Sequence, residues 1–434
     1  MSVEALEDRK YLSATVTLLN NGHTLSIVGD RSDNHIAITQ DAGGVQVTAD
    51  SAPPQRFTGI DLIQVETGDG NDDVRVIYGF NPQPDPPGMP LRVAELRVRL
   101  GAGNDSFNVT GQLPPAATRI GVDAGTGNDD VSVICGFNPQ PDPPADPIRS
   151  FDFYAQLGAG NDRFTGNMVW PPDPRGASNQ AFPPDPCRIT ILGDAGADSI
   201  NALIGLLSNA TPAGDVSSAL SLNFYGGDGN DSVMSTFRNV NLNGSTSIDL
   251  QGGNGNDVVR QALDMVTVNA GLSLSANGGA GDDTVAVMTG TETRPDAAPS
   301  LFVNSPVRLN VEGGLGNDRL LGLIIPCIKP EASLDVVFSG GSGNDVISIL
   351  MGLEAGLLNP PSDRPASPGE LNPPSEHDGP IHLAVIGGEG DDQLYLTVRN
   401  LGHSKSMLDI RLDGAPGKDT VVATPGIDTS GWTN

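Results

Sequence analysis

Aspartate recurs at one position of a short glycine-rich motif along almost the whole chain. The stretch 252–259 reads Gly-Gly-Asn-Gly-Asn-Asp-Val-Val, and the general pattern is Gly, any residue, Gly, usually Asn, then Asp, any residue and an aliphatic residue. The Asp of this motif falls at Asp72, Asp105, Asp129, Asp162, Asp198, Asp231, Asp257, Asp283, Asp318, Asp345, Asp392 and Asp419. The copies at Asp198 and Asp419 are looser, and a degenerate first copy spans 29–36. Glycine reaches left-handed backbone angles that aim carbonyls and amides at one point, and a hard cation takes six to eight carboxylate and carbonyl oxygens. The motif therefore predicts several calcium sites with these twelve Asp side chains as ligands.

Aspartates stacked in this way need a partner for their charge. Carboxylates one strand spacing apart, about 4.8 Å, repel by about 3.5 kcal/mol at an effective dielectric of 20 and by about 0.9 kcal/mol in bulk water. Either a cation lies between them, or each carboxylate accepts N–H groups of its own turn, as in Asx turns, while the preceding Asn forms an amide ladder. The residues alone leave both arrangements open.

The composition excludes several classes of partner. Acidic residues number 53 against 24 basic ones, which gives a net charge of −29. Such a chain repels nucleic acid and anionic membranes and attracts cations. No run of about 18 apolar residues is present, so no membrane span is expected. Aromatic residues are only 4% of the chain, so the core is expected to be aliphatic. Cys135, Cys187 and Cys327 are too few and too scattered to form a disulfide framework, and Cys135 takes the place that Tyr78 holds one duplication earlier, which indicates packing.

The glycine-rich motif resembles the hemolysin-type (RTX) calcium-binding repeat, Gly-Gly-x-Gly-x-Asp-x-aliphatic-x. The stretches 226–233 and 278–285 match it at every defined position. The resemblance implies a β-helix in which turn carbonyls and the Asp carboxylate ligate calcium shared between stacked turns, with the aliphatic residue pointing into the core. In that family the motifs follow in tandem, whereas here single copies stand 24 to 47 residues apart. Calcium is then shared only if successive coils place their motifs directly above one another.

Between the motifs the chain alternates apolar and polar residues, as strands do. Around Asp257 the runs 247–250, 258–263 and 265–268 predict three short strands and three turns in 26 residues, about one coil of a parallel β-helix. No window holds a 3.6-residue period, so almost no helix is expected. We therefore predict an all-β chain: a right-handed parallel β-solenoid of about twelve coils over 14–434, with a capping part at 14–60. The predicted core includes Val131, Val133, Val285, Val287, Ile347 and Ile349.

The longer intervals between motifs carry Pro-rich segments. They fall at 79–90, 136–147, 170–186, 291–300 and 353–380, and Gly-Phe-Asn-Pro-Gln-Pro-Asp-Pro-Pro occurs both at 79–87 and at 136–144. Because Pro donates no N–H to a β-ladder, these segments are predicted to be loops on the side of the solenoid opposite the motif. Insertions on one face often form a binding face, here for an extracellular matrix, polysaccharide or protein partner. Surface decoration is an equally open interpretation.

The first residues point to the cell envelope. The segment 3–13, Val-Glu-Ala-Leu-Glu-Asp-Arg-Lys-Tyr-Leu-Ser, resembles the LEPR-XLL type of sorting motif at the N-termini of large bacterial envelope and secreted proteins. The resemblance implies that residues 1–13 are a sorting segment and that the protein is secreted or lies on the cell surface. The alternative is a disordered or helical lead-in.

Together these features favour a non-catalytic extracellular scaffold whose folding is coupled to calcium. Two alternatives stay open. One is a metal-free structural or adhesive solenoid that binds a partner through its Pro-rich loops, and the other is a polysaccharide-acting β-helix enzyme that uses Asp–Arg neighbours such as 162–163 and 318–319. Neighbours on a strand point to opposite faces and few aromatic residues are present to stack on sugars, so no enzyme is predicted.

Overall fold

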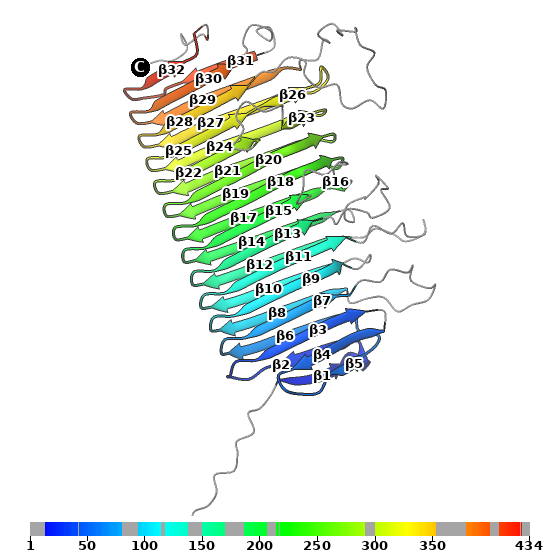
Figure 1. Cartoon of the computed structure of the whole chain (residues 1–434). Coiled ribbons are helices and arrows are strands. Elements are labelled where there is room, and N and C mark those ends of the chain that lie inside the picture. The colour runs from blue at the N-terminus through cyan, green and yellow to red at the C-terminus, as the bar shows by residue number, and fades with distance from the viewer. Residues whose placement is uncertain are drawn as a thin grey trace, which may run out of the picture.

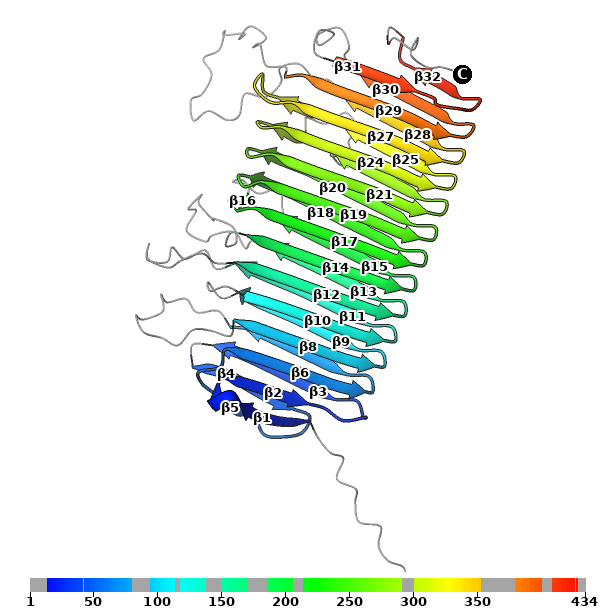
Figure 2. The ribbon, with the colours of Figure 1, turned by 180° about the vertical axis from the view of Figure 1, so that it is seen from behind.

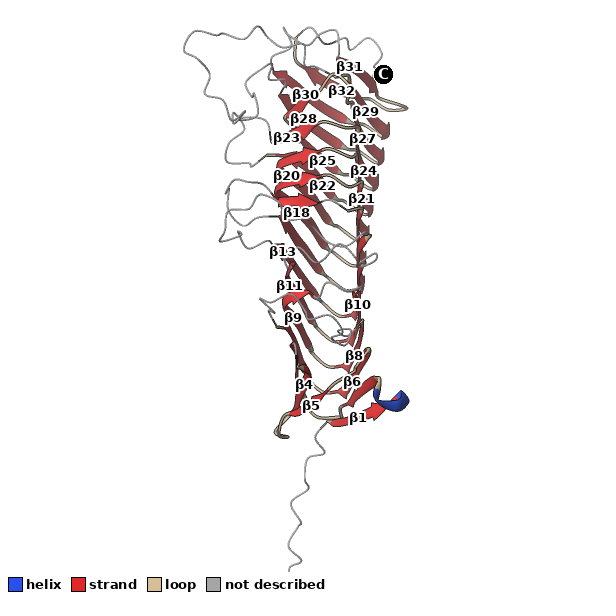
Figure 3. Ribbon diagram, turned by 90° about the vertical axis from the view of Figure 1, so that its right-hand side faces the viewer, coloured by secondary structure: helices blue, strands red, loops and turns tan. Residues whose placement is uncertain are grey.

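The chain forms two long parallel β-sheets that face one another and wind upward in successive coils. The computed structural model describes residues 14–41, 43–79, 94–113, 118–137, 150–169, 186–205, 214–216, 218–290, 300–352, 379–399, 408–425 and 427. Figure 1 shows the coils stacked from the N-terminal strands to the C-terminal ones, and Figure 2 shows the same stack from behind. Viewed from the side, the solenoid is flat, with one sheet on each broad face (Figure 3). The predicted parallel β-solenoid is confirmed.

Sheet A contains fourteen strands, which pair in the order of the chain. They are β1 (Thr15–Leu19), β2 (Thr24–Val28), β6 (Leu62–Asp69), β8 (Glu95–Ala102), β10 (Thr118–Thr126), β12 (Phe151–Ala159), β14 (Cys187–Ala195), β17 (Leu220–Asp228), β19 (Thr246–Asn254), β21 (Leu272–Ala280), β24 (Val307–Leu315), β27 (Leu334–Ser342), β29 (Ile381–Glu389) and β31 (Leu408–Asp413).

Sheet B contains the strands that return along the other face. They are β3 (His35–Asp41), β4 (Gly44–Ala49), β5 (Gln55–Phe57), β7 (Asp73–Tyr78), β9 (Ser106–Leu113), β11 (Asp130–Phe137), β13 (Arg163–Val169), β15 (Ser199–Gly205), β16 (Gly214–Val216), β18 (Ser232–Leu242), β20 (Val258–Val268), β22 (Thr284–Thr289), β23 (Leu301–Val303), β25 (Arg319–Ile324), β26 (Pro326–Ile328), β28 (Val346–Gly352), β30 (Gln393–Arg399) and β32 (Thr420–Ala423).

A single parallel register runs through each sheet, so equivalent residues of successive coils form straight columns. Ile248 in β19, for example, pairs with Leu222 in β17 on one side and with Leu274 in β21 on the other. Side chains alternate between the core and solvent with a period of two, and the burial pattern of β19 follows this alternation. A shift of one residue would turn every apolar side chain outward, so the hydrophobic pattern fixes the register.

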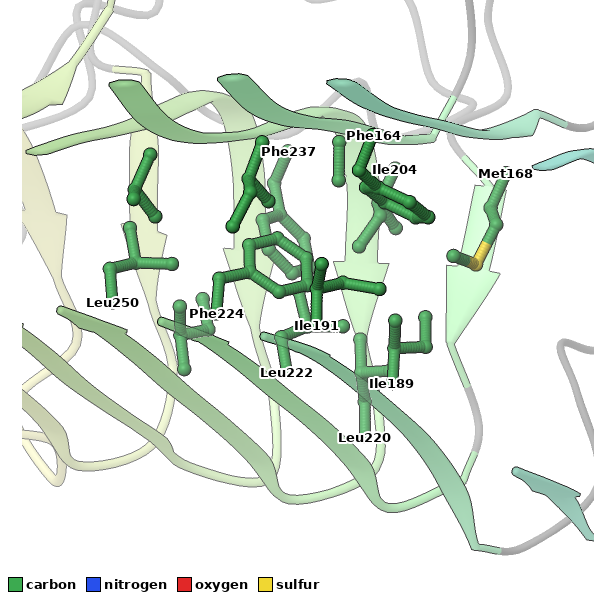
Figure 4. Packing of buried hydrophobic residues seen from close by; sticks show 14 of the residues in the cluster. Phe164, Met168, Ile189, Ile191, Ile204, Leu220, Leu222, Phe224, Phe237 and Leu250 are labelled. Carbon is green, nitrogen blue, oxygen red and sulfur yellow. The ribbon is translucent and has the colours of Figure 1, made fainter. Parts of the chain in front are cut away.

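The core lies between the two sheets. The six core residues predicted above are all at most 3% exposed, which confirms them. The expectation of an aliphatic core was incomplete, because seven Phe side chains are also fully buried. Three of the aromatic rings meet in the middle coils: the ring centroid of Phe164 lies 5.8 Å from that of Phe153 and 6.3 Å from that of Phe224. Figure 4 shows Phe164 and Phe224 between the two sheets. These bulky rings fill the gap between two facing sheets, a space that short aliphatic side chains alone would leave loosely packed.

Each coil has two main strands rather than the three predicted. The run that was expected to be a third strand after Asp257 is the end of β20, which continues past a bend at Met265 with a φ of 56°. Asn239, with a φ of 49°, marks the same bend in β18. Short strands such as β23 and β26 pair with this outer part of the sheet. At this bend β20 changes direction without ending, so no separate third strand is formed.

The two ends of the solenoid are built differently. At the N-terminal end β1 pairs antiparallel with β2 through the turn Asn20–Gly22, and β4 pairs antiparallel with β3 and β5. At the C-terminal end, β31 pairs with β29 and β32 with β30, and no other described strand pairs with either of them. Within the described residues, the only helix is the short 3-10 turn Asn20–Gly22, and no helix there is long and apolar enough to span a membrane.

Two groups of sequence predictions fall largely or wholly outside the described residues. The N-terminal segment 1–13 is one of them, and the Pro-rich loops, apart from their first or last residues, are the other. Cys135 and Cys187 are buried in the core, where burial raises the pKa of each thiol to about 12. Cys135 lies one coil from Gly111 and two coils from Tyr78 in one column, so its predicted role in packing is confirmed.

Candidate functional site

The motif aspartates lie along one narrow edge of the solenoid, where the strands of sheet A from β6 onward turn into the next strand of sheet B. In the coil of Asp257 the turn runs from the end of β19 at Asn254 to the start of β20 at Val258. The same tight turn repeats in coil after coil along this edge (Figure 1). The edge is therefore a single continuous surface, although its members are spread over most of the chain.

All twelve predicted site residues lie in one buried column. Each Asp is at most 9% exposed and its Oδ1 accepts the backbone N–H of the equivalent residue one coil earlier. These N–H···Oδ1 distances are 2.7–2.8 Å along the column and 3.1 Å at its C-terminal end. The alternative in which each carboxylate accepts N–H groups of its own turn is therefore wrong. The carboxylate does accept a backbone N–H, but the donor belongs to the preceding coil.

The weak copies of the motif do not interrupt the column. Asp198 and Asp419 each occupy the same position as the clear copies, and the column also crosses the longest interval, from Asp345 to Asp392. The degenerate copy at 29–36 begins it, because the N–H of Asn34 donates to Asp72. The first member is thus a neutral amide, buried at 1% exposure.

A second ladder runs along the outside of the same turns with the opposite polarity. The residue before the Asp, usually Asn, accepts at its Oδ1 the backbone N–H of the equivalent residue one coil later, except at Ala197 and Lys418, which have no side-chain oxygen. Asn256 accepts in this way from Asp282, and Asp282 accepts from Asn317. The side chains of this outer ladder are exposed. Successive N–H groups of one turn therefore point to opposite neighbours, and both are satisfied by side chains of adjacent coils.

Glycine is required in these turns for two reasons. Gly255 has a φ of +135°, which L-residues with a side chain rarely adopt. A Cβ placed on it would also overlap the carbonyl oxygen of Gly229 in the preceding coil. The turns consequently stack with their backbones in direct contact, which keeps the Asp column in register.

The second carboxylate oxygen has a different environment from the first. In all twelve aspartates Oδ2 is buried and accepts no hydrogen bond. A buried polar atom without a partner costs about 1–3 kcal/mol, and more if it is charged. The column therefore contains a row of unsatisfied oxygens, one per coil, that sequence reasoning did not anticipate.

The residue five positions before each Asp decides what surrounds Oδ2. In eight consecutive coils it is glycine. The last is Gly414, and the seven that have a described coil after them are Gly193, Gly226, Gly252, Gly278, Gly313, Gly340 and Gly387. A Cβ on Gly278 would overlap both Oδ2 of Asp283 and the carbonyl oxygen of Gly313 in the next coil. Both oxygens thus enter the space that a side chain would fill. We call this space, bounded by the glycine, Oδ2 and the next carbonyl, the glycine niche.

The four earlier coils have a side chain in place of the glycine niche. The residue five positions before Asp is Thr67, Leu100, Ala124 or Leu157, and each is 0% exposed. The hydroxyl of Thr67 donates to the carbonyl oxygen of Leu100 at 2.6 Å, so that carbonyl already has a donor. The single column of aspartates therefore contains two kinds of coil, and the local glycine is the sequence signal that separates them.

Burial raises the pKa of these carboxyl groups. The pKa rises from 3.8 to about 7 for Asp105, Asp198 and Asp345, and to about 6 for Asp129, Asp162, Asp231, Asp283 and Asp318. The pKa values of Asp72, Asp257 and Asp392 are raised for the same reason. Desolvation is the largest cause in every case, the N–H bond to Oδ1 opposes it, and in most cases the charge of a neighbouring Asp adds to it. These eleven carboxyl groups thus hold their protons more tightly than free aspartate does.

The oxygen atoms along this edge are of the type that binds a hard cation, but the side chains do not form a conventional metal-binding cluster. Carboxylate and carbonyl oxygens are the ligands that Ca²⁺ takes, and the glycine niche brings one of each together. Within the described residues, no group of three or more His, Cys, Asp or Glu side chains is placed to hold a metal ion. A cation at this edge would accordingly depend on backbone oxygens for much of its coordination.

Comparison of the chain with protein-family models, with curated proteins and with solved structures gave no match.

Proposed function

We propose that the protein is a non-catalytic calcium-binding scaffold, in which ions held along the glycine–aspartate edge stabilise the solenoid. The observation that carries this proposal is the row of buried Oδ2 atoms without a hydrogen-bond partner, seven of which share a glycine niche with a carbonyl oxygen of the next coil. A cation in that space would neutralise the carboxylate and join two adjacent coils.

The energetics favour a neutralising partner over a bare row of charges. A pKa raised by about three units means that ionising one such carboxyl group costs the fold about 4 kcal/mol. A typical domain is stable by only about 5–15 kcal/mol. Ionising the whole column without a counter-charge would therefore cost more than that stability. Either bound cations or retained protons must supply the counter-charge, and the net charge of −29 draws cations to the molecule.

The glycine niche limits the proposed sites to part of the column. Between Asp198 and Asp392 both oxygens reach into the same space, whereas between Asp72 and Asp162 a side chain fills it. We therefore assign calcium to the seven glycine coils and not to the four that precede them. In the earlier coils no cation is assigned, and burial raises the pKa of the carboxyl groups.

The proposed location is outside the cell, on the bacterial surface or in the secreted fraction. Calcium-binding modules with affinities in the 10⁻⁴–10⁻³ M range are suited to extracellular calcium, and the N-terminal segment resembles an envelope sorting motif. A flat solenoid stabilised by external calcium could carry the Pro-rich segments as contact points for a matrix, polysaccharide or protein partner.

Calcium titration of the full chain tests the proposal. After EDTA treatment, isothermal titration should give no more than about seven sites, and millimolar calcium should raise the melting midpoint, because a ligand that binds only the folded state stabilises it. Asp283→Asn should reduce both effects. Asp282→Asn is the matched control, since it removes one negative charge from the adjacent, exposed residue of the outer ladder. Asp129→Asn, in a coil whose niche is filled by Ala124, is the second control.

The outcomes separate the candidate functions. If calcium leaves the melting midpoint unchanged, the second candidate holds: a metal-free scaffold whose carboxyl groups are kept neutral by protons. The N–H bonds to Oδ1, which hold each carboxyl group without a metal, favour that candidate. If Asp129→Asn reduces calcium binding as much as Asp283→Asn does, calcium binds but the glycine niche does not select its sites.

A further inference from the structure

The outer surface of sheet A, one of the two broad faces of the solenoid (Figure 3), carries a stripe of amide side chains over six consecutive coils. One straight column of outward-facing residues runs from β12 to β24 through Gln156, Leu192, Tyr225, Gln251, Asn277 and Glu312. The outward-facing column beside it crosses the same six strands from Tyr154 to Asn310. Neither column contains Lys or Arg in these coils, whereas the same columns contain Arg97 and Arg99 in β8. We call the two columns between β12 and β24 the amide face.

The carboxylates on and beside the amide face are bound by neutral groups. Three of them each accept a hydrogen bond from an amide side chain: Asp194 from Gln156 at 2.7 Å, Asp249 from Gln251 at 3.1 Å and Glu312 from Asn310 at 2.7 Å. The Tyr225 hydroxyl also donates to Asp249, at 3.2 Å. Each amide keeps a second N–H and its oxygen, and each carboxylate can accept further hydrogen bonds. The pairs therefore offer donors and acceptors side by side, which is what a row of hydroxyl groups requires.

These carboxylates recur in every second coil. They belong to β14, β19 and β24, and one strand of sheet A lies between each of them and the next. At about 4.8 Å per coil the period is about 9.6 Å, which is close to the length of two sugar residues in an extended polysaccharide. A polymer that lies along the direction of stacking can therefore meet equivalent groups repeatedly.

Two of the five tyrosines of the chain lie on the amide face. Tyr154 is 40% exposed. Its neighbour in β10 is Gly121, and a Cβ placed there would have no atom within 4 Å. Open space therefore lies beside Tyr154, and a flat ring can enter it. Tyrosine combines an apolar ring with a polar hydroxyl, so it suits a sugar, whose ring has apolar faces and a polar rim.

The backbone of Asp194 is an independent sign that this surface has a use. Its φ is +72°, at a position that is glycine in every other coil from Gly68 to Gly388. Residues with a side chain rarely adopt this conformation, and those that do cluster at functional sites. Glycine would suit the turn better, so the strain points to a role for the carboxylate that Asp194 places beside Gln156.

We propose that the amide face binds an uncharged polysaccharide in an extended conformation, with the polymer lying along the direction in which the coils stack. Sugar rings stack on Tyr154 and Tyr225. Their hydroxyl groups donate to Asp194, Asp249 and Glu312 and accept from the amides that hold these carboxylates. The inference does not rest on bound calcium, because none of these residues belongs to the glycine niche.

The chemistry of the amide face favours this partner over others. An anionic polysaccharide would be repelled by the three carboxylates and by the net charge of −29. A protein partner usually brings an apolar centre to its interface, and Leu192 is the only aliphatic side chain in the two columns between β12 and β24.

Affinity electrophoresis of the full chain tests the proposal. Native gels contain hydroxyethylcellulose, glucomannan or xyloglucan, with polygalacturonate as the anionic comparison, and millimolar calcium in every gel. At least one uncharged polymer should retard the protein, and polygalacturonate should not. Tyr154→Ala should weaken this binding about fivefold, because it removes a stacking surface. Asp249→Ala should weaken it about tenfold, because it removes a charged acceptor.

Two matched variants serve as controls. Tyr395→Ala removes an equally exposed tyrosine, 41% exposed, from sheet B on the other broad face. Asp335→Ala removes a carboxylate from β27, one coil beyond the amide face. Both should bind as the wild type does, and circular dichroism should show that all four variants fold. The proposal is overturned if no uncharged polymer retards the protein, if only polygalacturonate does so, or if the two controls weaken binding as much as Tyr154→Ala and Asp249→Ala.

Discussion

Replacing Asp345 by Asn tests how the buried column is balanced. Asp345 is 0% exposed, its Oδ1 accepts the N–H of Asp318 at 2.8 Å, and its Oδ2 has no partner. Asn keeps an oxygen for the N–H of Asp318. It also replaces Oδ2 by an NH₂ group, a donor that faces the carbonyl oxygen of Gly387 across the glycine niche at Gly340. The substitution therefore imitates the protonated acid without changing its shape.

The size and sign of the effect follow from the pKa of Asp345. Burial, added to by the charges of Asp318 and Asp392, raises that pKa from 3.8 to about 7. Below pH 3.8 the carboxyl group is protonated in both the folded and unfolded states, and its contribution is fully present. As the pH rises to 7, the unfolded state loses the proton and the folded state keeps it, so stability is lost. Above pH 7 the loss reaches about 4 kcal/mol.

Asp345→Asn should remove this loss in the absence of metal. In EDTA at pH 8 the variant should be more stable than the wild type, by up to about 4 kcal/mol, while at pH 4 the two should be nearly equal. With millimolar calcium at pH 8 the order should reverse, because calcium stabilises the ionised wild type and Asn is a poorer ligand. Urea denaturation followed by circular dichroism gives the comparison. If Asn destabilises the protein equally at pH 4 and pH 8 in EDTA, Oδ2 of Asp345 is not an unpaired buried charge and the reasoning fails.

Other predictions concern the turns, the core and the C-terminal strands. Gly255→Ala should destabilise the protein by about 2 kcal/mol or more, because its φ is +135° and its Cβ meets the Gly229 carbonyl, whereas Gly121→Ala, with open space around it, should be nearly neutral in the same denaturation assay. Phe224→Ala should cost about 3–5 kcal/mol by creating a cavity between the sheets (Figure 4). Asn256→Ala should cost only about 1 kcal/mol, since it removes one exposed hydrogen bond. Hydrogen exchange should be faster in β31 and β32 than in β19 and β20, because each of the former pairs with only one described strand, and equal protection would contradict this expectation.

The regular parts of the fold were predictable because their signals are local. Gly and Asp at fixed positions mark every turn of the edge, and alternation marks the strands that join them. The coils stack in the same register through the loose copy at Asp198 and across the long interval before Asp392. The register is set by the apolar pattern of the strands and not by the length of the loop between them. An insertion outside the strands costs little in loop-closure entropy.

The less regular parts depended on contacts between coils, which no single repeat encodes. One of the two arrangements left open by the motif has Asp bonding within its own turn, yet Asp257 accepts the N–H of Asp231, one coil earlier, because the stacked turns bring the two atoms to 2.7 Å. The Phe residues of the core were too few to suggest a pattern, but Phe164 and Phe224 come together through the register of separate coils. The glycine niche could not be predicted from one repeat either, because it is formed by Gly278 and Asp283 together with a carbonyl oxygen of the next coil.

The direction of the two ladders explains why the ends of the solenoid are not equivalent. Each Asp in the inner column supplies an acceptor to the coil before it, so every turn depends on the coil that follows. At the N-terminal end the column begins with the neutral Asn34, beneath strands that close the sheets. At the C-terminal end Asp419 supplies an acceptor to Asp392, and no described coil follows to stabilise its own turn. In the outer ladder the N–H of Lys418 donates to Asp391, yet Lys418 has no side-chain oxygen to offer a following coil. Within the described residues, the turn at Asp419 therefore has no following coil to supply it with a side-chain acceptor, whereas the turn at Asn34 receives one from Asp72.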